Sequence, residues 1–184
     1  MRNFNHQEIF NMKKQKGFSL IELLIVVAII LIIAAIAVPS LLKARVSANN
    51  SAAAATTRTI STGEATYVTQ YPTAGFAPDL ASLGSGASGT IPCVATTTSA
   101  CIIDNTLGCK TTWCVKDAFW YNVTLSTGDY TISAFPIGGQ GTNDYCATGD
   151  NTVRVQNPTA NAAAANTAPS TPFTNAACVT LPAQ

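Results

Sequence analysis

The sequence predicts an α+β protein in which a long hydrophobic N-terminal helix packs on a small antiparallel sheet head. Three observations predict this class. An unbroken apolar tract covers residues 18–38, a helical hydrophobic period follows it to about residue 70, and two alternating segments flank a short turn between residues 119 and 135. The 184 residues leave room for one domain besides the apolar tract.

Residues 1–17 are predicted to be a leader peptide that is removed. The segment is polar and carries most of its charge as Arg2, Lys13, Lys14 and Lys16 before ending at Gly17. An ordinary secretory signal is cut after its hydrophobic stretch, whereas the natural cut here lies before it, between Gly17 and Phe18. The lysines favour the cytoplasmic side and therefore place everything after the apolar tract outside the cytoplasm. Because this leader holds four basic residues against Glu8 alone, the rest of the chain carries a net charge of about −2, and a basic nucleic-acid-binding face is not indicated.

The apolar tract is long enough to cross a membrane. As a helix, residues 18–38 rise about 31 Å, close to the ~30 Å hydrocarbon core of a bilayer. Fifteen of these residues are Phe, Leu, Ile or Val. Together they outweigh the cost of Glu22, which is on the order of 3 kcal/mol for an acidic group at the helix centre.

Glu22 has no lysine, arginine or histidine within the span to pair with. Cleavage after Gly17 would create a partner, because the new α-amine of Phe18 is cationic and about one turn away. That amine could meet Glu22 of the same chain or of a neighbouring copy, and a buried pair of this kind is better suited to fixing register than to adding stability. The alternative is a Glu22 that is protonated or reaches the membrane interface.

The segment KGFSLIELLIVVAIILIIAAIAVPSLLKAR resembles the N-terminus of type IV pilins and of type II secretion pseudopilins. The resemblance rests on the joint spacing of a basic leader, Gly17, Phe18, Glu22, the apolar run and Pro39. It implies that a prepilin peptidase cleaves after Gly17 and N-methylates Phe18, and that Glu22 docks the next subunit. It also implies identical and related subunits as partners, together with an assembly platform and its ATPase in the inner membrane.

Residues 18–39 are accordingly expected to form a helix that is transmembrane in the precursor and lies in the core of a filament after assembly. Pro39 should kink or break this helix at the membrane boundary. Residues 40–71 are expected to form an amphipathic second half that ends before Pro72. Its predicted buried stripe runs through Leu42, Val46, Asn49, Ala53, Thr56, Ile60, Tyr67 and Tyr71, with Lys43, Arg45, Arg58 and Glu64 mostly off it.

Residues 72–184 are predicted to be a disulfide-bonded globular head. Its six cysteines follow the apolar tract, an even number in the part expected outside the cytoplasm. A metal site is the alternative, but the head offers neither Cys-x-x-Cys pairs nor histidine. The hypothesis joins Cys93 with Cys101, Cys109 with Cys114, and Cys146 with Cys178, among fifteen possible pairings.

The clearest strands are residues 119–125 and 130–135, which form a hairpin around the turn 126–129. A third strand is expected at about 152–156, after a turn at 147–151. Residues 72–117 are interpreted as a long connection without a sustained period, and residues 157–177 as an exposed, loosely ordered, low-complexity tail.

The sequence offers no catalytic, cofactor or metal site. His6, the sole histidine, lies in the leader, so a mature chain would lack histidine-activated nucleophiles and histidine-ligated zinc. The head carboxylates are interpreted as turn and cap residues, with a calcium site near Asp144 and Asp150 left open. Asn122, Val123 and Thr124 fit an N-glycosylation pattern, although Asn122 lies in a predicted strand.

The leading hypothesis is therefore a structural subunit of a surface filament that serves adhesion, twitching motility or DNA uptake. The precursor would reside in the inner membrane with its head outside the cytoplasm, and the assembled subunit at the cell surface. The first alternative is a type II secretion pseudopilin. The second is a single-span membrane enzyme or sensor, which would leave unexplained a cut ahead of the span.

Overall fold

The computed structural model describes residues 17–85, 93–157 and 167–184. The predicted leader lies outside the described residues except for Gly17, as does the middle of the low-complexity segment at 158–166. The chain divides into two compact units, one that ends at Leu41 and one that covers Leu42–Gln184. We call the second unit the head, because it holds the whole sheet.

Helix α1 covers Leu20–Gln70 and contributes to both units. It begins after Ser19, whose backbone carbonyl accepts from the amides of Glu22 (3.1 Å) and Leu23 (3.2 Å). It ends before Pro72, as the sequence predicts. Pro39 lies inside α1 and does not break it, because a proline removes one backbone donor while the turns on both sides keep theirs. A kink at Pro39 stays a prediction.

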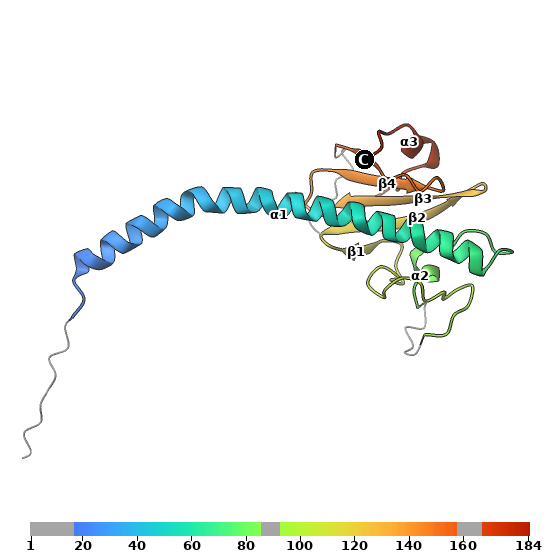
Figure 1. The fold of residues 1–184 in the computed structure, drawn as a ribbon, viewed down its shortest axis with the longest axis horizontal. Helices are drawn as coiled ribbons and strands as arrows, with labels where there is room; N and C mark the ends of the chain where they lie inside the picture. Colours follow the sequence, from blue (N-terminus) through green and yellow to red (C-terminus); the bar gives the residue numbers. More distant parts are fainter. Residues whose placement is uncertain (1–16, 86–92, 158–166) are drawn as a thin grey trace, which may run out of the picture. The chain divides into compact units, whose positions relative to one another are not determined.

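The head contains one antiparallel five-stranded sheet with the order β1-β2-β3-β4-β5. The strands are β1 (Cys114–Lys116), β2 (Phe119–Ser126), β3 (Asp129–Pro136), β4 (Asp144–Thr148) and β5 (Arg154–Gln156). The predicted hairpin is β2 and β3, with Ser126 opposite Asp129 at its tight end. Figure 1 shows this sheet beside the later turns of α1. The observed class is α+β with a pilin-like order of elements.

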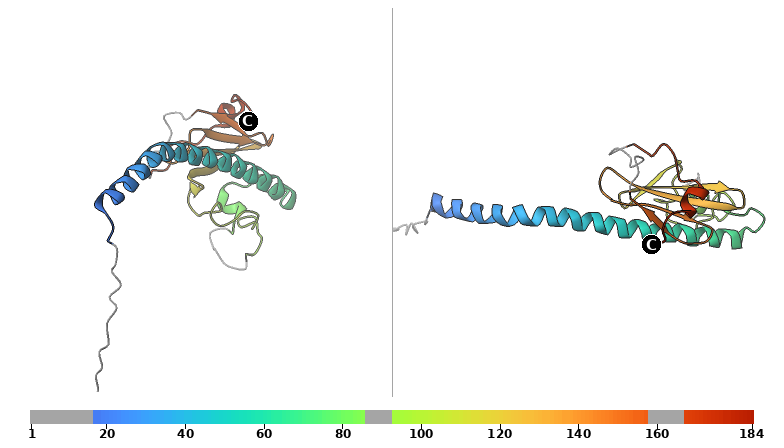
Figure 2. Two further views of the ribbon diagram at one scale, coloured as in Figure 1. Left: turned by 60° about the vertical axis from the view of Figure 1, so that its left-hand side comes forward. Right: turned by 90° about the horizontal axis from the view of Figure 1, so that it is seen from above.

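One face of the sheet packs against α1. Tyr121, Val123 and Ile132 belong to this inner face, and they share a buried cluster with Ile60 and Tyr67 of the helix. Two views in Figure 2 show the helix running along the sheet within the head. The buried part of α1 is rich in small residues, namely Ala53, Ala54, Thr56, Thr57, Ser61 and Gly63. Small side chains let the large aromatic rings of the sheet fill the space beneath the helix.

The predicted stripe on α1 is only partly buried. Ala53, Thr56, Ile60 and Tyr67 are buried, but Leu42 is 57% exposed, because it lies at the boundary of the head. Glu64, expected off the stripe, is fully buried. This expectation was wrong because it gave the charge more weight than the helical spacing, which puts Glu64 on the same face as Ile60 and Tyr67.

The other face of the sheet is covered by the C-terminal segment, so the expectation of a loosely ordered tail is wrong for its last part. The ring of Phe173 stacks on Phe135 with centroids 5.0 Å apart, and its backbone N–H donates to Ser133 Oγ at 2.9 Å. Helix α3 (Asn175–Val179) follows, and Cys178 joins Cys146 of β4. One aromatic ring and one disulfide hold this segment although its composition is poor in bulky apolar residues.

Besides α3, three elements were not predicted from the sequence. Strand β4 was missed, and residues 147 and 148, expected in a turn, belong to it. All five of its residues are buried, so it has no polar and apolar alternation to detect. Strand β1 and helix α2 (Leu80–Leu83) fall in the segment interpreted as a connection. Elements of three or four residues are too short to show a period.

Candidate assembly surface

The first unit exposes a continuous apolar helix surface. Phe18 is 83% exposed and Ile36 is 74% exposed, and the large apolar residues between them are 47–77% exposed. Mean hydropathy reaches 3.3 in this part of α1, which is the one candidate membrane span among the described residues, and none of its most apolar stretch is buried. An apolar surface of this extent requires lipid or another apolar surface to cover it.

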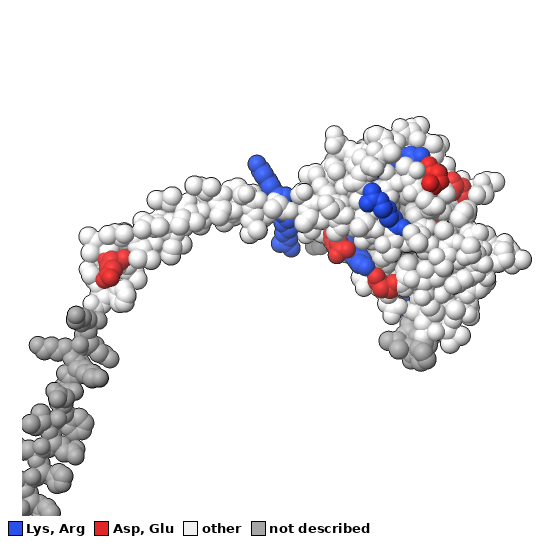
Figure 3. All heavy atoms as spheres, in the orientation of Figure 1, with Lys and Arg blue, Asp and Glu red and all other residues white. Residues whose placement is uncertain are grey.

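Glu22 is the sole ionisable side chain between Phe18 and Val38. It lies in the first turns of α1, where a negative charge interacts favourably with the helix dipole. Figure 3 shows one acidic group on an otherwise uncharged surface in the first part of the helix. Gly17 and Phe18 precede the helix in an extended segment, and a Cβ atom added at Gly17 would meet nothing within 4 Å. Cleavage between Gly17 and Phe18 stays a prediction.

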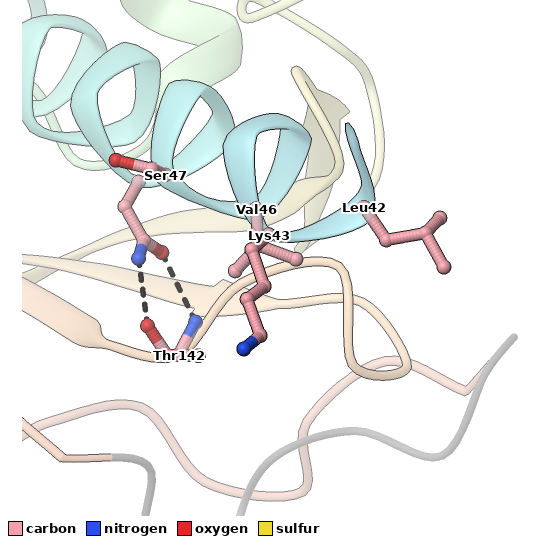
Figure 4. Close-up of a pocket in the computed structure, with 6 residues that line it drawn as sticks. Leu42, Lys43, Val46, Ser47 and Thr142 are labelled. Atoms are coloured by element: carbon pink, nitrogen blue, oxygen red, sulfur yellow. Dashed lines mark hydrogen bonds between the residues drawn. The ribbon is translucent and has the colours of Figure 1, made fainter. Parts of the chain in front are cut away.

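A groove of about 460 Å³ lies at the beginning of the head. We call it the Lys43 groove. It is lined by Leu42, Lys43, Val46, Ser47 and Asn50 of α1, and by Thr142 of the loop between β3 and β4. Figure 4 shows Leu42, Lys43 and Val46 on the helix and Thr142 on the loop opposite. Its lining carries one positive charge and no negative charge.

Two asparagines fix the loop that forms the far wall of this groove. The Asn50 side chain makes two hydrogen bonds to Thr142: Nδ2 donates to Oγ1 at 2.7 Å, and Oδ1 accepts from the backbone N–H at 3.0 Å. The neighbouring Asn49 Nδ2 donates to the Gln140 carbonyl at 2.8 Å. Gly141 packs so closely on the ring of Phe119 that an added Cβ would lie 2.5 Å from it. The groove is therefore preformed in the isolated head.

The six cysteines form three disulfides, Cys93–Cys101, Cys109–Cys114 and Cys146–Cys178, with Cα atoms 6.1, 5.6 and 5.9 Å apart. These pairs coincide with those the sequence proposes. No free cysteine remains, since all six lie in described segments. The first two bonds close short loops in the segment between α2 and β1, and the third ties the C-terminal segment to the middle of the sheet.

Most head carboxylates act as caps or brace turns. Asp79 caps α2 by accepting from the Ser82 amide at 2.8 Å, and Asp129 accepts from the Gly149 amide at 2.7 Å. Asp150 pairs with Arg154 at 2.5 Å, and this charge-assisted hydrogen bond lowers the pKa of Asp150 to about 2. Asp144, in β4, and Glu64, on α1, are exceptions, because both are fully buried.

Asp144 and Asp150 occupy different environments. Asp144 begins β4 and is fully buried, whereas Asp150 follows the end of that strand and pairs with Arg154. Among the described residues, no group of three or more His, Cys, Asp or Glu side chains could hold a metal ion. The structure therefore offers no support for the calcium interpretation.

Asn122 is only 4% exposed and its Nδ2 donates to the Thr112 carbonyl at 2.6 Å. A glycan needs this nitrogen free and accessible. In the folded head, the acceptor pattern at 122–124 is therefore closed to modification.

Glu64 is a buried acidic residue whose burial the sequence did not predict. Its Oε2 accepts from the backbone N–H of Ala77 at 2.9 Å, which ties α1 to the segment leading into α2. Its Oε1 has no hydrogen-bond partner among the described residues, and neither does the nearby Ser61 hydroxyl. The pKa of Glu64 is raised to about 8, chiefly by burial and to a smaller extent by the negative charge of Asp79, against the lowering effect of the Ala77 hydrogen bond. At neutral pH the folded head therefore holds this carboxyl mainly in its neutral form.

Comparison with known families finds the prokaryotic N-terminal methylation motif at residues 12–38. This motif is typical of type IV pilins and pseudopilins, so the resemblance stated from the sequence is confirmed for this segment. No curated protein and no solved structure matches the chain. The motif and the α+β order of elements together indicate a pilin-like or pseudopilin-like precursor with a membrane anchor.

Proposed function

We propose that this chain is a structural subunit of a type IV pilus. The observation that carries the proposal is the exposed apolar helix surface after Phe18, which lies inside the methylation motif and contains Glu22 as its lone acid. A stable anchor alone would not need a cut ahead of the span. A filament subunit does, because the cut removes the charges that hold the helix end at the membrane face.

In this proposal, prepilin peptidase cuts between Gly17 and Phe18 and methylates the new amine. The head remains outside the cytoplasm while the apolar helix waits in the inner membrane, until an assembly platform and its ATPase transfer it into the filament. The helix exchanges lipid for the apolar flanks of identical helices, so little hydrophobic free energy is lost. Glu22 then pairs with the Phe18 amine of an adjacent copy and fixes the stagger between the two helices.

Mass spectrometry of the mature protein tests the processing step. We expect a chain that begins with N-methylated Phe18, and an intact Met1 on the working protein would contradict the proposal. Shearing of cells tests the location: this chain should be a main component of the released filaments.

A Glu22→Ala variant tests docking. The variant should be cleaved and held in the membrane, yet give few filaments, because the register signal is lost while the apolar surface is kept. A Ser19→Ala variant, which leaves Glu22 in place, is the matched control and should assemble normally. Normal filament yield from Glu22→Ala would refute the docking role.

Pseudopilins of type II secretion share the same motif, so this role is the alternative. Recovery of the chain in the inner membrane with secretion machinery, and never in sheared filaments, would decide for it. Three disulfides and a C-terminal segment tied to the sheet favour the surface filament, because they protect a head exposed outside the cell.

A further inference from the structure

None of the residues that the structure describes fills the Lys43 groove, and its chemistry restricts what can bind there. The Leu42 and Val46 side chains supply apolar surface, and the Lys43 ammonium is the one charge in its lining. Lys43 has no ion pair among the described residues, whose two salt bridges join other side chains. A complementary ligand is therefore elongated and apolar and carries a single negative charge.

The chain itself contains a segment of this description. Residues 18–38 form an apolar segment, helical from Leu20, with one acid, Glu22, and no base. Ile25 is 55% exposed and Ile29 is 53% exposed, which leaves them free to contact another surface. Ile25 and Ile29 follow Glu22 by three and seven residues, on a helix surface with no other charge. Val46 and Asn50 follow Lys43 at the same spacing.

We propose that the Lys43 groove receives the apolar helix of a second copy of this chain, with the partner's Glu22 facing Lys43. This inference rests on the proposed filament function and adds to it a specific contact between the head of one copy and the membrane-derived helix of another. Contact with Leu42 and Val46 covers apolar side chains of the partner helix that would otherwise meet water after that helix leaves the lipid. The charge pair selects the register, because any other stagger leaves Lys43 without an acidic partner in a contact lined by apolar side chains.

The two helices are parallel, because all copies insert into the membrane with the same orientation. The register then follows from counting. Ile25 lies three residues after Glu22, and Val46 lies three residues after Lys43, so these two side chains are neighbours across the contact. The loop at Thr142, held by its two hydrogen bonds to Asn50, provides a fixed wall against the partner helix.

This contact is compatible with the pairing of Glu22 and the Phe18 amine. A carboxylate has two oxygens that accept separate donors, and a subunit of a helical filament has more than one neighbour. The amine and Lys43 therefore contact the same acid from different copies.

Cysteine cross-linking in assembled filaments tests the register. The double variant Ile25→Cys with Val46→Cys is compared with Ile32→Cys with Val46→Cys. Ile32 lies two turns after Ile25 on the same side of the helix and is comparably exposed at 65%. The background is low, because all six native cysteines are engaged in disulfides. After mild oxidation of sheared filaments, we expect the 25/46 pair to give a ladder of covalent multimers at least about fivefold stronger than the 32/46 pair.

A second measurement does not depend on two substitutions. A photoreactive amino acid at position 46 should attach to residues 22–29 of another copy, as mapped by mass spectrometry of filament peptides. Lys43→Glu should lower filament yield at least about tenfold, whereas Lys43→Gln, which removes the charge without repulsion, should have a smaller effect.

The outcomes separate this inference from the proposed function. Absence of wild-type filaments would overturn both. Filaments with equal cross-linking of the two cysteine pairs, or with photo-adducts outside residues 22–29, would overturn the inference alone. Selective 25/46 cross-linking together with adducts within 22–29 would support it.

Discussion

The buried carboxyl of Glu64 makes the stability of the head depend on pH. The folded head holds the proton up to a pKa of about 8, whereas the unfolded chain releases it near 4.5. Between these values the folded state binds more protons than the unfolded state, so the free energy of unfolding falls as pH rises. The stabilisation is complete below pH 4.5 and is lost as pH passes 8.

The size of the effect follows from the width of this window. Each pH unit within it costs at most about 1.4 kcal/mol, and the whole interval corresponds to at most about 5 kcal/mol. This is comparable to the total stability of many small domains. Substitution with Gln keeps an oxygen to accept the Ala77 amide and removes the titration, so Glu64→Gln should abolish the slope.

Urea unfolding of the residue 42–184 head at pH 5, 6, 7 and 8 measures this slope directly. This segment is a compact unit, and it contains no histidine to titrate in the same range. Burial raises the pKa of Tyr130 to about 12, and the bond to Arg154 lowers that of Asp150 to about 2, so both lie outside the window. We expect wild-type stability to fall by about 3 kcal/mol from pH 5 to pH 8, and that of the variant to stay level within about 0.5 kcal/mol.

The comparison between the two proteins decides the outcome. Equal slopes for wild type and Glu64→Gln would refute the reasoning, because the titrating group would then lie elsewhere. Glu8, in the leader, is absent from the head and cannot contribute. Hydrogen exchange at the Ala77 amide gives an independent check, since its protection should fall above pH 8 in the wild type alone.

Three further predictions concern the framework of the head. Cys146→Ser should cost up to about 4 kcal/mol in urea unfolding, because its disulfide spans 32 residues, whereas Cys109→Ser, whose bond spans 5, should cost about 2 kcal/mol. Gly108→Ala should destabilise the head by about 3 kcal/mol or more, because the added Cβ would lie 2.5 Å from a backbone Cα. Gly139→Ala should cost only about 1 kcal/mol, through the positive φ at that position. Equal costs for the two substitutions would argue against the clash. Asn50→Ala should cost about 1 to 2 kcal/mol and raise exchange at the Thr142 amide, and unchanged exchange there would contradict the role given to the clamp.

The elements that the sequence predicted have strong local signals. Helix α1 has a long helical period, and the hairpin of β2 and β3 has alternating side chains around a tight turn with Gly128 at φ +78°. The exposed apolar helix surface was also predictable, because the methylation motif is defined by residues at fixed spacing. In each case the information lies within a few dozen consecutive residues.

The elements that were missed are set by tertiary contacts. Strand β4 is recognisable only once its neighbours β3 and β5 are in place, because burial on both faces removes its alternation. The docking of Phe173 depends on Phe135, nearly forty residues earlier, and the Lys43 groove depends on a loop brought to α1 from the far side of the sheet. Contacts between residues this far apart in the chain produce no local periodic pattern in the sequence.

The two parts of α1 show why one helix can serve two different environments. Before Pro39, Leu, Ile and Val occupy every side of the helix, so no rotation hides them from water and the surroundings must supply the apolar contacts. After Asn50, Ala, Ser and Thr face the sheet, and hydroxyls such as Thr57 Oγ1 return their hydrogen bonds to the carbonyl four residues earlier, at 2.9 Å from Ala53. The head can therefore fold around the second part while the first part is still in lipid. Transfer of the first part from lipid to other helices would then leave the fold of the head unchanged, because the buried cluster of the head includes no residue before Ala53.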